Sequence, residues 1–221
     1  MGCHGALNGL RVANAFATAD PNARVLLCAV ELCSLHYHCG DDADKAVANA
    51  IFADGAAAVV GRCSEPSRPL AQFRPSDGGE RPWRVASTSS CIIPGTSAAM
   101  GWTIGDHGFE MTLARTIPDL IARNIRPWVE SWLRTEGLSL SEVGSWAVHP
   151  GGPKILTAAE EGLGLPPGAV AASRAVYAEF GNMSSATVLF VLDRLRRAGA
   201  QRPCVALGFG PGLVAEGVLF R

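Results

Sequence analysis

Cysteine, histidine and asparagine side chains, each close to a glycine, are the candidate reactive groups of this chain. Cys3 stands between Gly2 and His4 at the predicted start of a helix. A helix N-terminus and a nearby imidazolium both stabilise a thiolate, which is the reactive form of cysteine. We therefore interpret Cys3 as a candidate nucleophile. A small, buried, unreactive residue is the alternative, and it fits most of the other six cysteines.

Two further residues could polarise a carbonyl group. His149 ends a predicted strand and enters the turn 150–153, so its imidazole can point into a cleft at the carboxyl edge of a sheet. Asn182 precedes a predicted helix, where it could cap the helix or direct its amide N–H at a developing oxyanion. Any chain of 221 residues contains these three residue types, so the prediction of acyl chemistry depends on their local contexts.

Two other clusters contain residues with chemistry of their own. The segment 208–212 (GFGPG) lies between two predicted strands and lacks the G-x-G-x-x-G spacing of a dinucleotide-binding loop. It could line a site with backbone N–H groups or simply be a tight turn. The second cluster contains metal-ligand residue types, namely Cys33, His36, His38 and Cys39. Their spacing matches no common zinc pattern, so we predict no metal site.

The composition excludes several classes of protein. About half of the 221 residues (48%) are apolar, and 19 basic and 20 acidic side chains give a net charge of −1. This balance excludes a disordered chain and a nucleic-acid binder that works through bulk positive charge. No apolar run reaches the ~18–20 residues of a membrane helix, and the N-terminus is unlike a signal peptide. Seven scattered cysteines indicate reduced core residues, so we expect a globular, cytoplasmic chain.

Helices and apolar strands alternate along the chain, which indicates an α/β fold. The predicted helices cover residues 3–19, 43–52, 154–163 and 184–197, and a further helix from Thr116 must kink or split at Pro127. The predicted strands cover residues 24–32, 56–60, 83–93, 146–149, 203–208 and 213–220. The run Arg24–Leu32 is continuously apolar, as expected for a strand covered on both faces.

A polar, proline-rich segment divides the chain. Residues 63–82 are predicted to be a loop or linker between residues 1–62 and residues 83–221. The two parts contain similar helix–strand units. Gly2 precedes a predicted helix, and the strand that follows begins at Val25, 23 residues after Gly2. Gly181 likewise precedes a predicted helix, and the strand that follows begins at Val205, 24 residues after Gly181. Internal duplication of the fold would explain this similar spacing. The alternative is that helix–strand units of this length are common in α/β proteins.

Five stretches of the chain together resemble the type III polyketide synthases, the chalcone and stilbene synthase-like enzymes of the thiolase fold. They occur in the family's order: Gly2-Cys3, Phe52-Ala53-Asp54-Gly55-Ala56-Ala57-Ala58, His149-Pro150-Gly151-Gly152-Pro153, Gly181-Asn182-Met183-Ser184-Ser185-Ala186 and Gly208-Phe209-Gly210-Pro211-Gly212. The resemblance implies a layered α-β-α-β-α, thiolase-like fold that is internally duplicated. Its N-terminal half would be incomplete, because family members have further strands before the nucleophile.

The resemblance also implies a reaction. Cys3 would take the acyl group of a starter acyl-CoA, with the oxyanion held by backbone N–H groups near Cys3 and in the loop Gly208–Gly212. His149 and Asn182 would bind the thioester carbonyl of malonyl-CoA, stabilise the enolate left by loss of CO₂, and allow condensation before ring closure. The thioesters supply the activation, so no metal or redox cofactor is implied. A homodimer is implied.

Family positions that shape the substrate cavity also have counterparts in this chain. Phe52 would be the gatekeeper aromatic between the substrate tunnel and the cavity, and Ser184 and Met111 would shape the cyclisation cavity. Met111 departs from the aromatic residue of plant chalcone synthases, and Cys33 and His36 replace residues that are smaller or hydroxylated in plant members. The plant product is therefore not expected.

Two alternatives to this function remain open from the sequence. One is a ketoacyl synthase III-like enzyme that condenses once on a carrier protein, and the other is a truncated, non-catalytic homologue that acts as a partner of a complete one. For the nucleophile, we expect a depressed pKa of Cys3 with His149 as the main cause, because the adjacent His4 is expected to point away.

Overall fold

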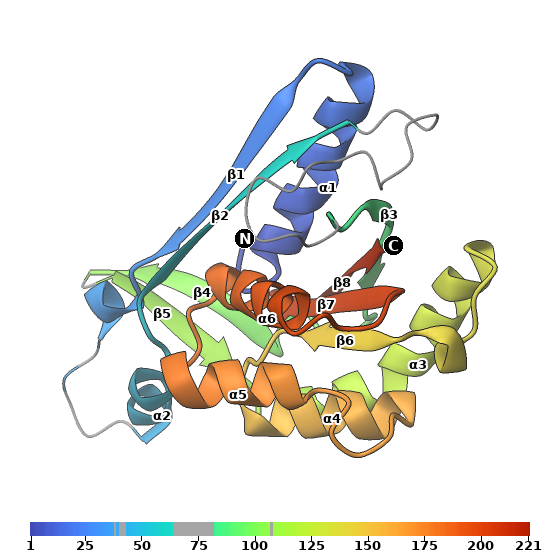
Figure 1. Ribbon diagram of the computed structural model, residues 1–221. Coiled ribbons are helices and arrows are strands. Elements are labelled where there is room, and N and C mark those ends of the chain that lie inside the picture. Colours follow the sequence, from blue (N-terminus) through green and yellow to red (C-terminus); the bar gives the residue numbers. More distant parts are fainter. Residues whose placement is uncertain (38, 40–42, 64–81, 107) are drawn as a thin grey trace.

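The computed structural model describes residues 1–37, 39, 43–63, 82–106 and 108–221. These residues form an α/β fold, as predicted, with one four-stranded and two two-stranded sheets (Figure 1). The helices are α1 (Gly5–Ala19), α2 (Ala43–Ile51), α3 (Ile117–Thr135), α4 (Pro153–Leu163), α5 (Ala171–Phe180) and α6 (Ser185–Arg197). The strands are β1 (Arg24–Glu31), β2 (Gly55–Arg62), β3 (Val85–Ile92), β4 (Met100–Gly105), β5 (Gly108–Leu113), β6 (Ser145–Val148), β7 (Cys204–Gly210) and β8 (Val214–Phe220).

The four-stranded sheet has the order β3-β8-β7-β6, in which β6 and β7 are parallel and the other pairs are antiparallel. Its two faces contact different helices because side chains alternate along each strand. Val148 and Leu207 face a core that contains residues of α3 and α4. Ala147 and Ala206 face a second core that contains residues of α1 and α6. Residues of odd number in β6 and of even number in β7 therefore point toward α1 and α6.

Strands β1 and β2 form a separate antiparallel sheet that extends beside α1 (Figure 1). Exposure alternates along both strands, and Leu26, Val30 and Val60 on the outer face are 62%, 64% and 72% exposed. The expectation that the strand Arg24–Leu32 is covered on both faces is therefore wrong for the described part of the chain. Among the described residues, the inner side chains pack on helices, whereas the outer apolar side chains lie beside one another across the two strands and stay largely exposed.

The other elements agree with the sequence in most places. Every predicted helix and strand has a counterpart in the structure. The two helix–strand units with similar spacing are present as α1–β1 and α6–β7. Helix α3 continues through Pro127 as one helix, while α5 and the β4–β5 hairpin were not predicted. Most of the predicted linker, residues 64–81, lies outside the described residues.

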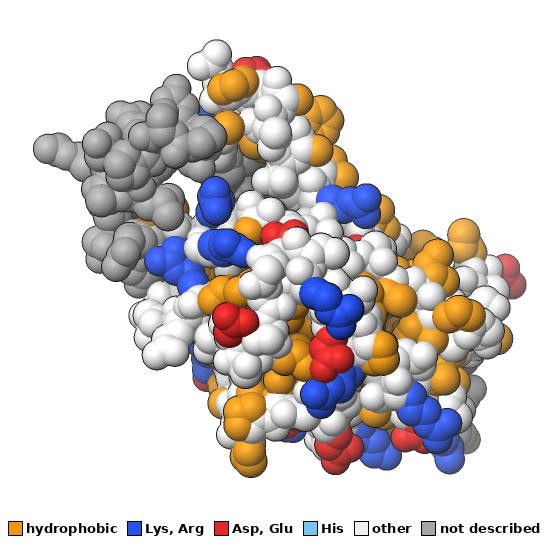
Figure 2. Space-filling view, turned by 90° about the vertical axis from the view of Figure 1, so that its right-hand side faces the viewer, with side chains coloured by type: hydrophobic (Ala, Val, Ile, Leu, Met, Phe, Trp, Pro, Cys, Tyr) orange, Lys and Arg blue, Asp and Glu red, His pale blue; other side chains and the backbone are white. Residues whose placement is uncertain are grey.

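Two compositional expectations can be compared with the structure. All seven cysteines are free; Cys204 is buried, Cys28 and Cys39 are exposed, and the rest are half-buried, so the prediction of core positions is wrong for the two exposed ones. Figure 2 shows charged side chains of both signs intermixed on one face, in keeping with the net charge of −1. None of the described helices combines the length and the apolar character needed to cross a membrane.

We expect the packing of α1 against the sheet to contribute strongly to stability. Leu7 is 1% exposed, so Leu7→Ala should leave a cavity and lower the free energy of unfolding by about 2–5 kcal/mol. The matched variant Val60→Ala, at a site that is 72% exposed, should change it by less than about 0.5 kcal/mol. Urea denaturation followed by circular dichroism measures both, and equal effects would contradict the described packing.

Candidate active site

The turn between β7 and β8 packs closely against the residues that precede α1. A Cβ on Gly2 would lie 2.8 Å from Cδ of Pro211, and a Cβ on Gly210 would lie 1.6 Å from Nδ1 of His4. Only glycine tolerates these approaches. The turn therefore fixes Cys3, between Gly2 and His4, at the end of the four-stranded sheet. The helix that follows begins at Gly5 with His4 as its N-cap, so Cys3 directly precedes the helix N-terminus and the helix starts two residues later than predicted.

Asn182 is held in one orientation at the start of α6. Its side-chain Oδ1 accepts a hydrogen bond from the Ser184 N–H at 2.9 Å, and its Nδ2 donates to the Gly151 carbonyl at 3.4 Å. Ser184 has a φ of 49°, a left-handed conformation that is strained for a residue with a Cβ. The amide N–H₂ of Asn182 consequently points toward the turn that follows His149.

His149 directly follows β6, and its backbone N–H donates to the Leu207 carbonyl at 2.8 Å. His149 is two residues after Ala147, and side chains two residues apart along a strand lie on the same face of the sheet. Its imidazole therefore lies on the face that packs against α1 and α6. The residue is 1% exposed, and neither ring nitrogen has a hydrogen-bond partner in the described structure. Burial, assisted by the nearby His4, lowers the pKa of His149 to about 3. The imidazole is therefore neutral and has one N–H to donate.

The Cys3 thiol is in hydrogen-bond contact with Asn182 and Ser184, and both contacts lower its pKa. These two hydrogen bonds are outweighed by desolvation, which is the largest influence, and by the Glu31 carboxylate. Desolvation and Glu31 together raise the pKa of Cys3 to about 11. Glu31 is itself held by the N–H and hydroxyl of Ser185. The expected depression of the Cys3 pKa by His149 is thus wrong in this structure.

A buried site penalises each charge that forms alone. A thiolate at Cys3 and an imidazolium at His149 would each be desolvated, so the resting pair is an uncharged thiol and an uncharged imidazole. In the resting structure the Cys3 thiol contacts Asn182 and Ser184, while the His149 ring has no hydrogen-bond partner among the described residues.

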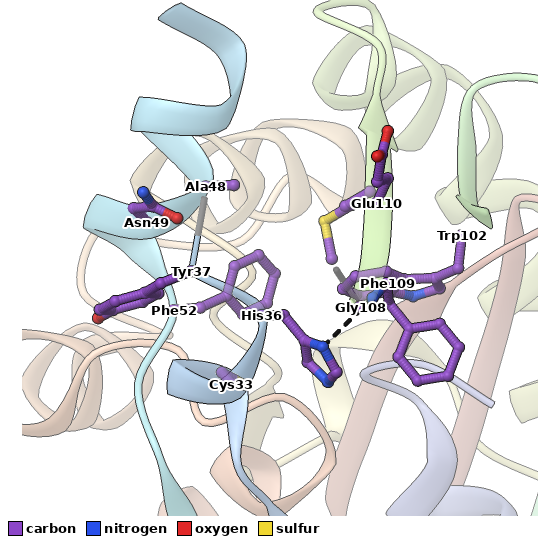
Figure 3. Close-up of a pocket in the computed structure, with 11 residues that line it drawn as sticks. Cys33, His36, Tyr37, Ala48, Asn49, Phe52, Trp102, Gly108, Phe109 and Glu110 are labelled. Atoms are coloured by element: carbon purple, nitrogen blue, oxygen red, sulfur yellow. Dashed lines mark hydrogen bonds between the residues drawn. The ribbon is translucent and has the colours of Figure 1, made fainter. Parts of the chain in front are cut away.

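A pocket beside the nucleophile brings together most of the predicted cavity residues (Figure 3). Phe52, Met111, Cys33 and His36 all line it. Phe52 pairs with Asn182 in an isolated parallel bridge, in which the Asn182 N–H donates to the Ile51 carbonyl at 3.0 Å. Ser184 contacts Cys3 instead of lining the pocket.

Several lining residues were missed by the sequence analysis. They come from the unpredicted β4–β5 hairpin, from α2 and from the segment before α2: Tyr37, Ala48, Asn49, Trp102, Gly108, Phe109 and Glu110. Figure 3 shows His36 beside Phe109, whose N–H donates to His36 Nδ1 at 3.3 Å. Trp102 and Phe109, two aromatic residues shortly before Met111, were the available signal. His38, of the cluster with metal-ligand chemistry, lies outside the described residues, and the described ones contain no group of three potential ligands.

Two sequence models of one protein family match this chain. The model for the N-terminal domain of chalcone and stilbene synthases matches residues 1–66, and that for their C-terminal domain matches residues 84–221. The chain belongs to the chalcone and stilbene synthase family. Solved type III polyketide synthases of this family share its thiolase-like α/β fold, as the sequence resemblance implied.

Individual chalcone and stilbene synthase-like proteins match along the whole chain. It is 37% identical to the 1,3,6,8-tetrahydroxynaphthalene synthase of Streptomyces peucetius subsp. caesius and 33% identical to the alpha-pyrone synthesis polyketide synthase-like Pks18 of Mycobacterium tuberculosis. These alignments cover 100% of this chain but only 57% and 55% of the two relatives. The chain thus spans little more than half the length of these family members.

Solved structures of family members are similar to this chain over its whole length. PKS-I from the brown alga Ectocarpus siliculosus has a TM-score of 0.90 and 35% identity, covering 100% of this chain and 58% of the algal chain. The 1,3,6,8-tetrahydroxynaphthalene synthase from Streptomyces coelicolor A3(2) has a TM-score of 0.86 and 31% identity, covering 100% and 60%.

We expect the contact between the β7–β8 turn and α1 to tolerate no side chain on Gly210. Gly210→Ala should displace the His4 ring and lower the free energy of unfolding by about 1–3 kcal/mol. Gly61→Ala is the matched control, because no described atom lies within 4 Å of the added methyl group. Thermal unfolding measures both variants, and a Gly210→Ala protein as stable as the control would refute the close approach.

We also expect the alkylation of Cys3 by iodoacetamide to keep accelerating above pH 10, because the thiolate reacts and the pKa is about 11. For an ordinary thiol, with a pKa of ~8.5, the alkylation rate would stop rising at a lower pH. Ser184→Ala removes a hydrogen bond that lowers the pKa and should move the profile to still higher pH, whereas Ser34→Ala, which alters a contact with Asp54, should not. Peptide mass spectrometry resolves the site, and a midpoint below pH 8.5 would restore the thiolate–imidazolium interpretation.

Proposed function

We propose that this chain carries the acyl-transfer and condensation site of a type III polyketide synthase. The observation that carries the proposal is the buried His149, whose two ring nitrogens have no partner among the described residues although Asn182 and Cys3 belong to the same site. Unpaired buried polar atoms are costly, so a site with such atoms is one that a polar ligand completes. A thioester carbonyl supplies the acceptor that an imidazole N–H requires.

In the first step, Cys3 Sγ attacks the carbonyl carbon of a starter acyl-CoA. The thiol proton passes to His149 and then to the departing coenzyme A sulfur, so that an acyl-Cys3 thioester and free coenzyme A result. Backbone N–H groups at Cys3 and in the loop Gly208–Gly212 are proposed to stabilise the tetrahedral oxyanion. The glycines of this loop allow its backbone to approach the nucleophile.

In the second step, malonyl-CoA is proposed to bind with its thioester carbonyl between His149 and Asn182. The bond to the carboxylate breaks, CO₂ leaves, and the electron pair forms an enolate whose oxygen accepts hydrogen bonds from these two donors. A donor of this kind is typically worth ~3–4 kcal/mol of barrier. The enolate carbon then attacks the acyl-Cys3 carbonyl, and the thiolate that is released takes a proton from solvent.

The pocket beside Phe52 and Met111 is proposed to hold the growing polyketide before ring closure. Thioester cleavage and loss of CO₂ supply the driving force, so we propose that no metal or redox cofactor takes part. A homodimer and a cytoplasmic location are proposed on the family resemblance.

The proposal is tested first by trapping the acyl-enzyme. Incubation of the chain with a panel of acyl-CoA thioesters should give an adduct on Cys3, the cysteine in contact with Asn182, and peptide mass spectrometry distinguishes it from Cys33 in the neighbouring pocket. Cys3→Ala should abolish the adduct, and Cys28→Ala, at an exposed position on β1, should retain it. Complete absence of a Cys3 adduct with every thioester would refute the assignment of the nucleophile.

The condensation site is tested by the release of CO₂ from malonyl-CoA. His149→Gln and Asn182→Ala should each lower this rate by about 100-fold or more, since each removes one donor to the enolate. His36→Gln, in the neighbouring pocket, should leave it within a few-fold. Reaction with malonyl carrier protein, and a single extension per product, would instead indicate a ketoacyl synthase.

A further inference from the structure

Glu216 is a buried acidic residue to which neither the sequence analysis nor the proposed mechanism assigns a role. It lies in β8 and is 6% exposed. Val218 and Phe220, on the same face of this strand, are apolar core residues. Among the described residues, no lysine or arginine forms an ion pair with Glu216. An apolar side chain of similar size would avoid the cost of desolvating a carboxylate. The carboxylate is therefore explained by the hydrogen bonds that it accepts.

The carboxylate of Glu216 connects two elements from distant parts of the chain. The hydroxyl of Ser90, directly opposite in β3, donates to its Oε1 at 2.6 Å. One terminal atom of the Asn8 amide, in α1, lies 3.0 Å and 3.2 Å from the two carboxylate oxygens. A carboxylate only accepts hydrogen bonds, so this atom is the amide nitrogen and Asn8 donates to both oxygens. Glu216 thus binds α1 directly to the four-stranded sheet.

One row of residues across this sheet contains both Glu216 and His149. Glu216 pairs with Gly208 of β7. Strand β6 pairs with β7 in parallel register, with Val148 beside Leu207, and the next step along both strands places His149 beside Gly208. Paired residues of neighbouring strands point to the same face of a sheet. The side chains of Glu216 and His149 therefore flank Gly208, which has none, on the face that packs against α1.

The first turn of α1 occupies the space that Gly208 leaves. A Cβ on Gly208 would lie 3.1 Å from Cδ1 of Leu7 and 3.4 Å from Cα of His4. The backbone N–H groups of Leu7 and Asn8 both donate to the His4 carbonyl, at 3.0 Å and 3.2 Å. Asn8, which Glu216 binds, is therefore one helical turn from the residue that follows the nucleophile.

We propose that Glu216 is a positioning residue for Cys3. By binding Asn8, it fixes where the start of α1 lies along the row that ends in His149, and so sets the position of Cys3 relative to that imidazole. Apolar packing holds α1 against the sheet but is non-directional, whereas a hydrogen bond depends on distance and angle. The consequence for acyl transfer rests on the proposed function, but the positioning itself does not.

The positioning is tested by hydrogen exchange of backbone amides in the full chain, measured by nuclear magnetic resonance. Glu216→Met removes the acceptors of the Asn8 amide and keeps a side chain of similar length. The backbone amides of Leu7 and Asn8, which donate to the His4 carbonyl, should then exchange about tenfold faster or more, because the first turn of α1 opens more often. The amide of Ile125, in α3, should keep its exchange rate, which distinguishes a local effect from a general loss of stability.

Three further variants separate the hydrogen bonds of Glu216 from its charge. Glu216→Gln removes the charge but can still bond with Ser90 and Asn8, so the two α1 amides should exchange slowly. Asn8→Ala removes the same contact from the side of α1. It should reproduce the effect of Glu216→Met, and the double variant should add nothing further. Asn124→Ala, in α3, is the matched control and should leave the α1 amides unchanged.

The consequence for the nucleophile is measured as the rate of acyl-Cys3 formation. In Glu216→Met this rate, at saturating acyl-CoA, should fall about tenfold while the half-saturating concentration stays the same. Unchanged exchange of the α1 amides in Glu216→Met and Asn8→Ala, equal acceleration at Ile125, or fast exchange in Glu216→Gln would overturn the proposal. If Glu216→Met does not fold, Asn8→Ala decides. An unmodified chain that forms no Cys3 adduct would count against the proposed function alone, because the exchange rates do not depend on activity.

Discussion

The site depends on one close approach of two backbones. Strand β7 and its turn pass so near residues 2–4 that Gly2 meets the Pro211 ring and Gly210 meets the His4 ring. Because these glycines have no side chains, the start of α1 can lie directly on the sheet end where His149 emerges. The beginning and the end of the chain therefore build a single site, and the hydrophobic contacts of α1 with α6 and the sheet hold that site in place.

Desolvation is the second physical constraint, and it shifts the pKa values of Cys3 and His149, the partners of the proposed proton transfer, in opposite directions. It raises the pKa of the Cys3 thiol and lowers that of the His149 imidazole, so that neither is charged at rest. The hydrogen bonds from Ser184 and Asn182 favour the thiolate but are outweighed. An uncharged thiol and an uncharged imidazole are compatible with the uncharged thioester that we propose as the reacting group.

The sequence predicts what local pattern determines and misses what depends on distant contacts. Hydrophobic periodicity and stop signals locate α1, β1 and α6, and the short motifs locate Cys3, His149 and Asn182. The β4–β5 hairpin is missed because, among the described residues, its strands pair only with each other, and they have exposed residues on both faces. The sequence wrongly predicts a depressed pKa for Cys3, because the burial of a residue in the folded chain cannot be deduced from its neighbours in the sequence. The environment of His4 depends on Gly210, which lies at the far end of the chain.

The isolated bridge between Phe52 and Asn182 connects the wall of the pocket to the proposed condensation site. The Ala53 N–H donates to the Asn182 carbonyl at 2.9 Å, and the Asn182 N–H donates to that of Ile51, so the position of one backbone fixes that of the other. An insertion or deletion near Phe52 would therefore displace Asn182 as well. Exchanging the side chains that line the pocket changes its capacity and leaves this backbone link intact, whereas a change of chain length here alters the pocket and the proposed site together.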